Sequence, residues 1–138
     1  DAEQWRPAQP VDAVLLDAPC TATGTVRRHP DIPYLKTPAD VIDLGRPQAA
    51  LLTAAFQMVK PGGMVVYCTC SLQPEEGPDR IENFLNDTPD ARRLPIDAGE
   101  VGAMSDLLNA QGDLRSLPCH LAESGGMDGF YAARLVRK

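Results

Sequence analysis

The sequence lacks both a long apolar run and an export signal. No stretch approaches the roughly 18 apolar residues of a membrane span, and residues 1–10 do not show the basic-then-apolar pattern of a secretory signal. These absences predict a cytoplasmic protein without a membrane-spanning segment, in which the four cysteines are reduced thiols. No internal repeat is visible, and residues 1–10 are expected to lead into one domain covering residues 1–138.

A net positive charge is also missing. Nineteen acidic residues stand against 13 basic ones, giving a formal charge of −6, which argues against a protein that holds nucleic acid through its overall field. Positive charge gathers locally at Arg27, Arg28 and His29, directly after the loop that contains Cys20. A solvated surface loop is the alternative interpretation of this triplet.

Common cofactor and metal motifs are absent. No G-x-G-x-x-G or Walker sequence occurs. Cys68 and Cys70 form a C-x-C, not the C-x-x-C of zinc sites and thioredoxin-type redox sites, so zinc is only a weak alternative. Cys119 and His120 could supply the other half of a metal site, but this spacing matches no common pattern, and no metal ligand is predicted. A thiol redox protein that uses these two cysteines remains an alternative, although a disulfide within C-x-C is strained. His29 and His120 lie in no triad-like pattern.

Apolar periodicity predicts an α/β fold with a parallel core. Buried strands are expected at 11–16 and 64–67, with a helix between them that begins at Thr37 and Pro38, includes Gln48 on its apolar face and ends at 60–63. Pro47 is a candidate point for this helix to restart. The other expected elements are a long loop over 20–38, a helix that starts near residue 74 and buries Ile81, Phe84 and Leu85, an edge strand over 92–96, a short helix over 101–108 and a last strand over 129–136.

Two cysteines follow the two predicted buried strands. Cys20 ends the run Asp17-Ala18-Pro19-Cys20, and Cys70 follows the second strand. Because open α/β folds bind ligands at the carboxyl ends of their strands, both thiols could face one substrate. Alternation along the strand predicts Cys70 at the loop mouth and Cys68 deeper in the core. Asp17 indicates a bound ligand, since a buried carboxylate is costly without a partner. The alternative interpretation of residues 17–20 is a turn that ends the strand, with Cys20 as an incidental buried residue.

Seven segments occur in a fixed order along the chain. They are residues 17–20, 24–31, 48–52, 60–63, 67–72, 74–76 and 127–133. Taken together they closely resemble the RNA 5-methylcytosine methyltransferases of the Sun/Fmu type. The resemblance covers residues 11–137, and seven matches in order are far more specific than any single motif.

The resemblance implies a Rossmann-like S-adenosylmethionine-dependent methyltransferase fold, of which this chain carries the C-terminal half of the sheet. It also implies methylation of C5 of cytosine in RNA, with 16S-type ribosomal RNA as the expected substrate. In the family the cysteine matching Cys70 is the nucleophile, the one matching Cys20 helps to release the product, and the aspartate matching Asp17 lies against cofactor and target base. The residues expected to contact RNA are Pro19, Arg27 and Arg28.

The chemistry of cytosine methylation explains why an enzyme of this kind would need two thiols. C5 of cytosine is too poor a nucleophile to accept a methyl group, but addition of a thiolate at C6 makes C5 enamine-like and reactive. The C5 proton must then be removed so that the thiol can be eliminated, and a second group beside the first can assist this step. The target base must also leave its stack to reach the thiols.

The sequence departs from the family pattern at two points. Gly77 stands where the family usually has asparagine. The glycine-rich cofactor loop and the acidic ribose-binding strand end, expected before Asp17, do not occur. The chain therefore resembles the second half of a catalytic domain, and little activity is expected of it alone. The alternative function is a non-catalytic RNA-binding or ribosome-assembly module that keeps the fold.

Overall fold

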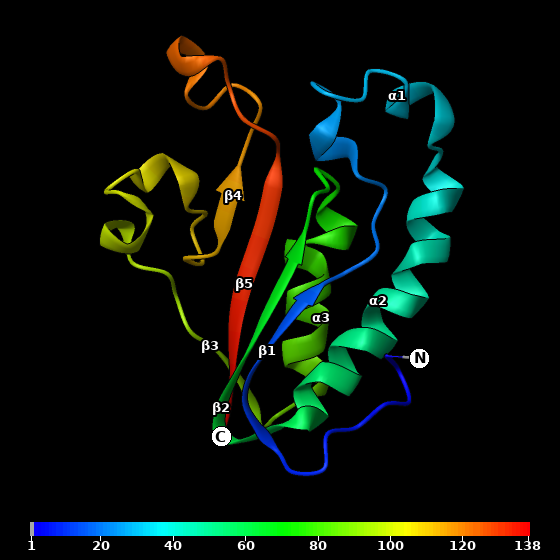
Figure 1. Cartoon of the computed structure of the whole chain (residues 1–138), viewed down its shortest axis with the longest axis vertical. Helices are drawn as coiled ribbons and strands as arrows, with labels where there is room; N and C mark the ends of the chain where they lie inside the picture. The colour runs from blue at the N-terminus through cyan, green and yellow to red at the C-terminus, as the bar shows by residue number, and fades with distance from the viewer. Residues whose placement is uncertain (1) are drawn as a thin grey trace.

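The computed structural model describes residues 2–138 and contains a five-stranded sheet. Strands β1, β2, β5 and β3 follow one another across it, and β4 also pairs with β5 (Figure 1). The strands predicted at 11–16, 64–67 and 129–136 are confirmed, and residues 2–10 form turns and bends before β1. The strand bounds are β1 (Val11–Asp17), β2 (Val59–Thr69), β3 (Ala91–Arg93), β4 (Leu114–Ser116) and β5 (Phe130–Arg137).

The predicted parallel core is correct only for one strand pair. Strands β1 and β2 are parallel, with Asp17 opposite Cys68. Strand β5 is antiparallel to β2, and β3 and β4 are antiparallel to β5. After β4 the chain loops over residues 117–129, and β5 then starts opposite the end of β2, so it runs antiparallel to β2. The apolar pattern of a strand does not encode its direction.

Helix α2 (Pro38–Met58) runs unbroken through Pro47, so the restart is not seen. Its start is as predicted. Thr37 and Asp40 form a capping box, in which the Asp40 Oδ2 accepts hydrogen bonds from the Thr37 N–H and Oγ1–H, both at 2.7 Å. Residues 60–63 lie inside β2, and the helix ends before them.

The second half of the chain departs more from the predictions. Helix α3 (Pro78–Asp87) follows a separate 3-10 turn at Pro74–Glu76. The helix predicted over 101–108 is wrong, because Gly102 adopts a left-handed φ of 67° and separates two 3-10 turns. Short elements that periodicity does not predict are the 3-10 turn Thr23–Thr25, helix α1 (Ile32–Leu35) and strand β4.

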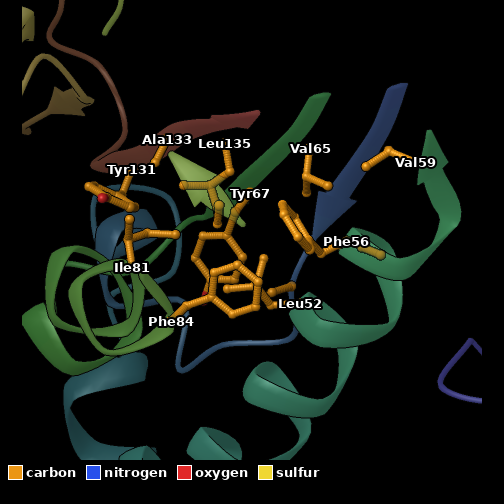
Figure 2. Close-up of a cluster of buried hydrophobic side chains, with 13 residues drawn as sticks. Leu52, Phe56, Val59, Val65, Tyr67, Ile81, Phe84, Tyr131, Ala133 and Leu135 are labelled. Carbon is orange, nitrogen blue, oxygen red and sulfur yellow. The ribbon is translucent and has the colours of Figure 1, made fainter. Parts of the chain in front are cut away.

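Helices α2 and α3 pack on the same face of the sheet (Figure 2). Phe56 of α2 meets Phe84 of α3 edge to face, with ring centroids 5.3 Å apart. Ile81 and Phe84 are buried as predicted, and Leu85 is partly buried against the same cluster. This core fixes both helices against β2 and β5 and so positions the loops at the carboxyl ends of β1 and β2. Within residues 2–138 no helix is long and apolar enough to cross a membrane.

Candidate active site

The two strand-end cysteines lie side by side. Parallel pairing sets Asp17 opposite Cys68, and the Ala18 N–H donates to the Cys68 carbonyl at 2.9 Å. Beyond this point both strands continue into loops, and the loops bring Cys20 Sγ to 3.5 Å from Cys70 Sγ. The structure therefore places together the two thiols that the sequence predicts to face one substrate.

The thiols differ in their surroundings. Burial raises the pKa of Cys20 to about 12, and the neighbouring Cys70 sulfur adds to the rise. Cys20 is therefore a protonated thiol at neutral pH and can donate a hydrogen bond to Cys70 Sγ. Burial, followed by the charge of Asp17, raises the pKa of Cys68 to about 11. Cys68 is buried and Cys70 only partly so, which matches the predicted core and loop-mouth positions.

Two glycines allow the loops to approach. The Gly24 N–H donates to the Cys70 carbonyl at 2.9 Å, and the Gly129 N–H donates to the Gly24 carbonyl at 2.8 Å. A Cβ on Gly24 would overlap the Gly129 carbonyl, and a Cβ on Gly129 would lie 2.5 Å from Leu72 Cδ2. Backbone hydrogen bonds thus join the loop after β1, the end of β2 and the entrance to β5.

Uncharged hydroxyl groups connect the same two loops. Ser71 Oγ lies 3.3 Å from Thr21 Oγ1 and 3.2 Å from Thr23 Oγ1. Thr23 Oγ1 accepts from the Leu72 N–H at 2.9 Å, and Ser71 Oγ accepts from the Gln73 N–H at 3.0 Å. These hydrogen bonds fix the loop carrying Cys20 relative to the loop carrying Cys70.

Glu76, a buried carboxylate that the sequence analysis did not predict, holds the residues on either side of Cys20 in place together with Gln48. Glu76 is fully buried and accepts hydrogen bonds from the Thr21 N–H at 3.0 Å and the Thr21 hydroxyl at 2.5 Å. Gln48 Nε2 donates to Glu76 Oε1 at 3.0 Å and to the Pro19 carbonyl at 2.8 Å. Both neighbours of Cys20 are therefore tied to one buried pair. The sequence feature that could have indicated this buried pair is the polar Gln48 on an otherwise apolar helix face.

The two arginines predicted to contact RNA are paired with Asp128. Arg28 Nε and Nη2 lie 2.7 and 2.6 Å from Asp128 Oδ2, and Arg27 Nη2 lies 3.6 Å from Oδ1. Asp128 raises the pKa of Arg28, and the charge of Cys70 adds a smaller rise. Arg28 in turn holds the pKa of Asp128 below its usual range. Both arginine side chains are about half exposed, at 46% and 54%, and stand at the surface beside the thiols.

The other predicted contact residues are open to a ligand. Asp17 is exposed at the end of β1, so the expectation of a buried carboxylate is wrong: the strand ends at the edge of the sheet, where its last side chain reaches solvent. Among residues 2–138 this carboxylate accepts only a weak hydrogen bond, from Cys68 Sγ at 3.8 Å. No ion pair within residues 2–138 includes Asp17. Pro19 is exposed, with its carbonyl held by Gln48. Over the same residues no group of three or more His, Cys, Asp or Glu side chains could hold a metal ion.

The sheet with its helices defines a partial Rossmann-like fold of the S-adenosylmethionine-dependent methyltransferase type. A family model described as 16S rRNA methyltransferase RsmB/F matches residues 1–136, and the chain belongs to this family. The family resemblance recognised from the sequence motifs is thereby confirmed.

Individual relatives agree with this assignment. Ribosomal RNA small subunit methyltransferase B of Salmonella dublin is 44% identical over 135 residues, covering 98% of this chain but 28% of that protein. The crystal structure of PH0851 matches with a TM-score of 0.80 at 32% identity, over 92% of this chain and 27% of that one. NSun6 from Pyrococcus horikoshii, solved with SFG, shares the fold, with a TM-score of 0.75 at 24% identity over 99% of this chain and 33% of that one. The chain thus spans about a third or less of the length of each.

Proposed function

We propose that this chain carries the thiol pair of an S-adenosylmethionine-dependent enzyme that methylates C5 of cytosine in RNA, with small-subunit ribosomal RNA as substrate. The observation that carries the proposal is the 3.5 Å separation of Cys20 Sγ and Cys70 Sγ at the carboxyl edge of the sheet. The name of the Salmonella dublin relative supports the substrate class. All four cysteines are free thiols, which fits action in the cytoplasm.

Asp17 is the residue of this chain that we assign to the cofactor. Its exposed carboxylate lies where the strands of open α/β folds meet their ligands, and it can accept hydrogen bonds from an amine or hydroxyl. When bound, S-adenosylmethionine supplies the methyl group that C5 acquires. Arg27 and Arg28, at the surface beside the thiols, are assigned to the RNA backbone, and the exposed Pro19 ring to the target nucleotide.

In the proposed reaction the Cys70 thiolate adds to C6 of the flipped cytosine. A new C6–Sγ bond forms, the ring becomes enamine-like and C5 can take the methyl group. The C5 proton then passes to solvent, the C5–C6 double bond re-forms, and the electron pair of the C6–Sγ bond returns to Cys70. Cys20, protonated because burial raises its pKa to about 12, donates a hydrogen bond to the Cys70 sulfur and stabilises it as it leaves.

The test uses the intact protein and a small-subunit ribosomal RNA transcript that contains 5-fluorocytidine. Fluorine at C5 cannot leave as a proton, so the wild type should form a covalent adduct that survives denaturing electrophoresis. Cys70→Ser should form none. Cys20→Ser should form the adduct and, unlike the wild type, should also accumulate it on ordinary RNA.

Two outcomes would contradict the proposal. If Cys70→Ser trapped the RNA and Cys20→Ser did not, the thiol roles would be reversed. If the wild type bound the RNA but neither trapped nor methylated it, the non-catalytic RNA-binding or assembly module would be the better explanation. Cys119→Ser is the matched control, because Cys119 is exposed and lies outside the assigned site.

A further inference from the structure

A cavity of about 990 Å³ lies beside the thiol loops. Thr21 and Thr23, which follow Cys20, form one part of its wall, and Leu72 and Gln73, which follow Cys70, form another. Helix α2 supplies a further part of the wall, which includes the apolar residues Val41, Ile42 and Ala49. Neither thiol lines this space, and the proposed reaction does not use it.

Arg80 brings to the cavity wall a positive charge that has no ion-pair partner among residues 2–138. Its Nε is buried and, among the same residues, has no hydrogen-bond partner. The guanidinium lies against Gly45 of α2, where a Cβ would be 2.9 Å from its Nη2. A partly buried cation without a partner is costly, and the cost is removed when an anion enters the cavity.

The cavity is electropositive although the chain is acidic. Lys36 and Arg46 line it together with Arg80, and among residues 2–138 Glu75 is the one acidic residue of its lining. These four residues leave an excess of positive charge, whereas the whole chain has a formal charge of −6. An anionic ligand whose C–H groups can pack on aliphatic side chains matches a wall made of cations and aliphatic side chains.

We propose that this cavity binds the phosphodiester and ribose that adjoin the target cytidine of the RNA, with Arg80 contacting the phosphate. The inference rests on the proposed function for its RNA ligand and adds a binding site to it. The loops that place the thiols also form the cavity wall, so one RNA strand can occupy both. The planar guanidinium of Arg80 is suited to pairing with phosphate oxygens.

The first experiment compares Arg80→Met with the wild type in the intact protein. Affinity for a radiolabelled small-subunit ribosomal RNA transcript is measured by filter binding from about 50 to 200 mM salt. We expect Arg80→Met to bind about tenfold more weakly and to lower the slope of log affinity against log salt by about 1. The control is Arg92→Met, because Arg92 is exposed on β3, away from the cavity.

A second measurement separates ligand binding from a structural role. Removing an arginine that supports the fold would lower the thermal unfolding midpoint, whereas removing an unpaired one should leave it unchanged or raise it. Gly45→Ala provides an independent variant that keeps the charge but displaces the guanidinium. It should weaken RNA binding in the same direction and by less than Arg80→Met.

The inference is overturned if Arg80→Met binds RNA with wild-type affinity and salt slope. It is also overturned if inorganic phosphate stabilises the wild type through Arg80 while RNA affinity is indifferent to that residue, since the site would then hold a free anion. Arg80-dependent RNA affinity in a protein that forms no 5-fluorocytidine adduct would support the cavity and refute only the thiol chemistry.

Discussion

Two buried carboxylates lie in different halves of the molecule, and they differ in whether a charged side chain is among their partners. Asp113, next to β4, is 1% exposed, forms an ion pair with Arg93 and accepts a hydrogen bond from the Tyr131 hydroxyl at 2.6 Å. Glu76, behind the thiol loops, is equally buried. Its side chain accepts hydrogen bonds only from the uncharged groups of a threonine and a glutamine among residues 2–138.

The two regions therefore differ in how a buried carboxylate is accommodated. Around Asp113 a buried charge is neutralised within the protein. Near the thiols, neither Glu76 nor Arg80 takes part in an ion pair among residues 2–138. Glu76 is fully buried and Arg80 partly so. Because such charges without an ion-pair partner lower stability, we infer that this part of the fold gives up stability for binding.

The largest effect is expected when Arg93, the cation that pairs with Asp113, is removed. Arg93→Met would leave the Asp113 carboxylate buried without its charge partner, and we expect the free energy of unfolding to fall by about 3 kcal/mol. Urea denaturation of the intact protein measures the loss. Arg92→Met, one residue earlier and exposed, should stay within about 0.5 kcal/mol of the wild type. A loss below about 1 kcal/mol would remove the distinction between the two regions.

A smaller loss is expected from Glu76→Gln. The glutamine side chain would place an NH2 group where Thr21 and Gln48 already direct hydrogen-bond donors. One hydrogen bond is therefore lost, but no buried charge is left without a partner. We expect a loss of about 1–2 kcal/mol in the same urea measurement. Glu75→Gln is the matched control, because Glu75 is exposed. A larger loss than that of Arg93→Met would show that the thiol half is the more dependent on its buried charge.

The smallest effect concerns alkaline pH. Burial raises the pKa of Cys20 from its ordinary 9.0 to about 12 in the folded protein, whereas the unfolded chain keeps the ordinary value. Above pH 9 the unfolded chain therefore releases a proton that the folded protein retains, so the free energy of unfolding falls as pH rises towards 12. Cys20→Ala should make that fall shallower in urea denaturation between about pH 8 and 10.5. An unchanged slope would mean that burial does not suppress ionisation of this thiol.

The elements that the sequence predicts well are those with a repeated local signal. The capping residue Thr37 and the apolar stripe after it define the start of α2, and the apolar run before Asp17 defines β1. The meeting of Cys20 and Cys70 could also be predicted, because two parallel strands must end at the same edge of the sheet.

Other features depend on contacts that no local pattern contains. Strand β4 has three residues, too few for a period, and the direction of β5 depends on the path of residues 117–129. The support behind Cys20 requires Gln48 from α2 to meet Glu76 from a 3-10 turn. In the sequence Glu76 is only one of two adjacent acids near a predicted helix start, so its burial follows from tertiary packing alone.

The hydrogen bonds through Gly24 also bear on the order of folding. Gly24 bonds to Cys70 on one side and to Gly129 on the other, so the thiol site closes only when three segments far apart in the sequence have met. Contacts of such long sequence separation carry a large loop-closure entropy and form slowly. The two thiols should therefore come together late, after α2 and α3 have formed, and until then each remains an isolated, accessible cysteine.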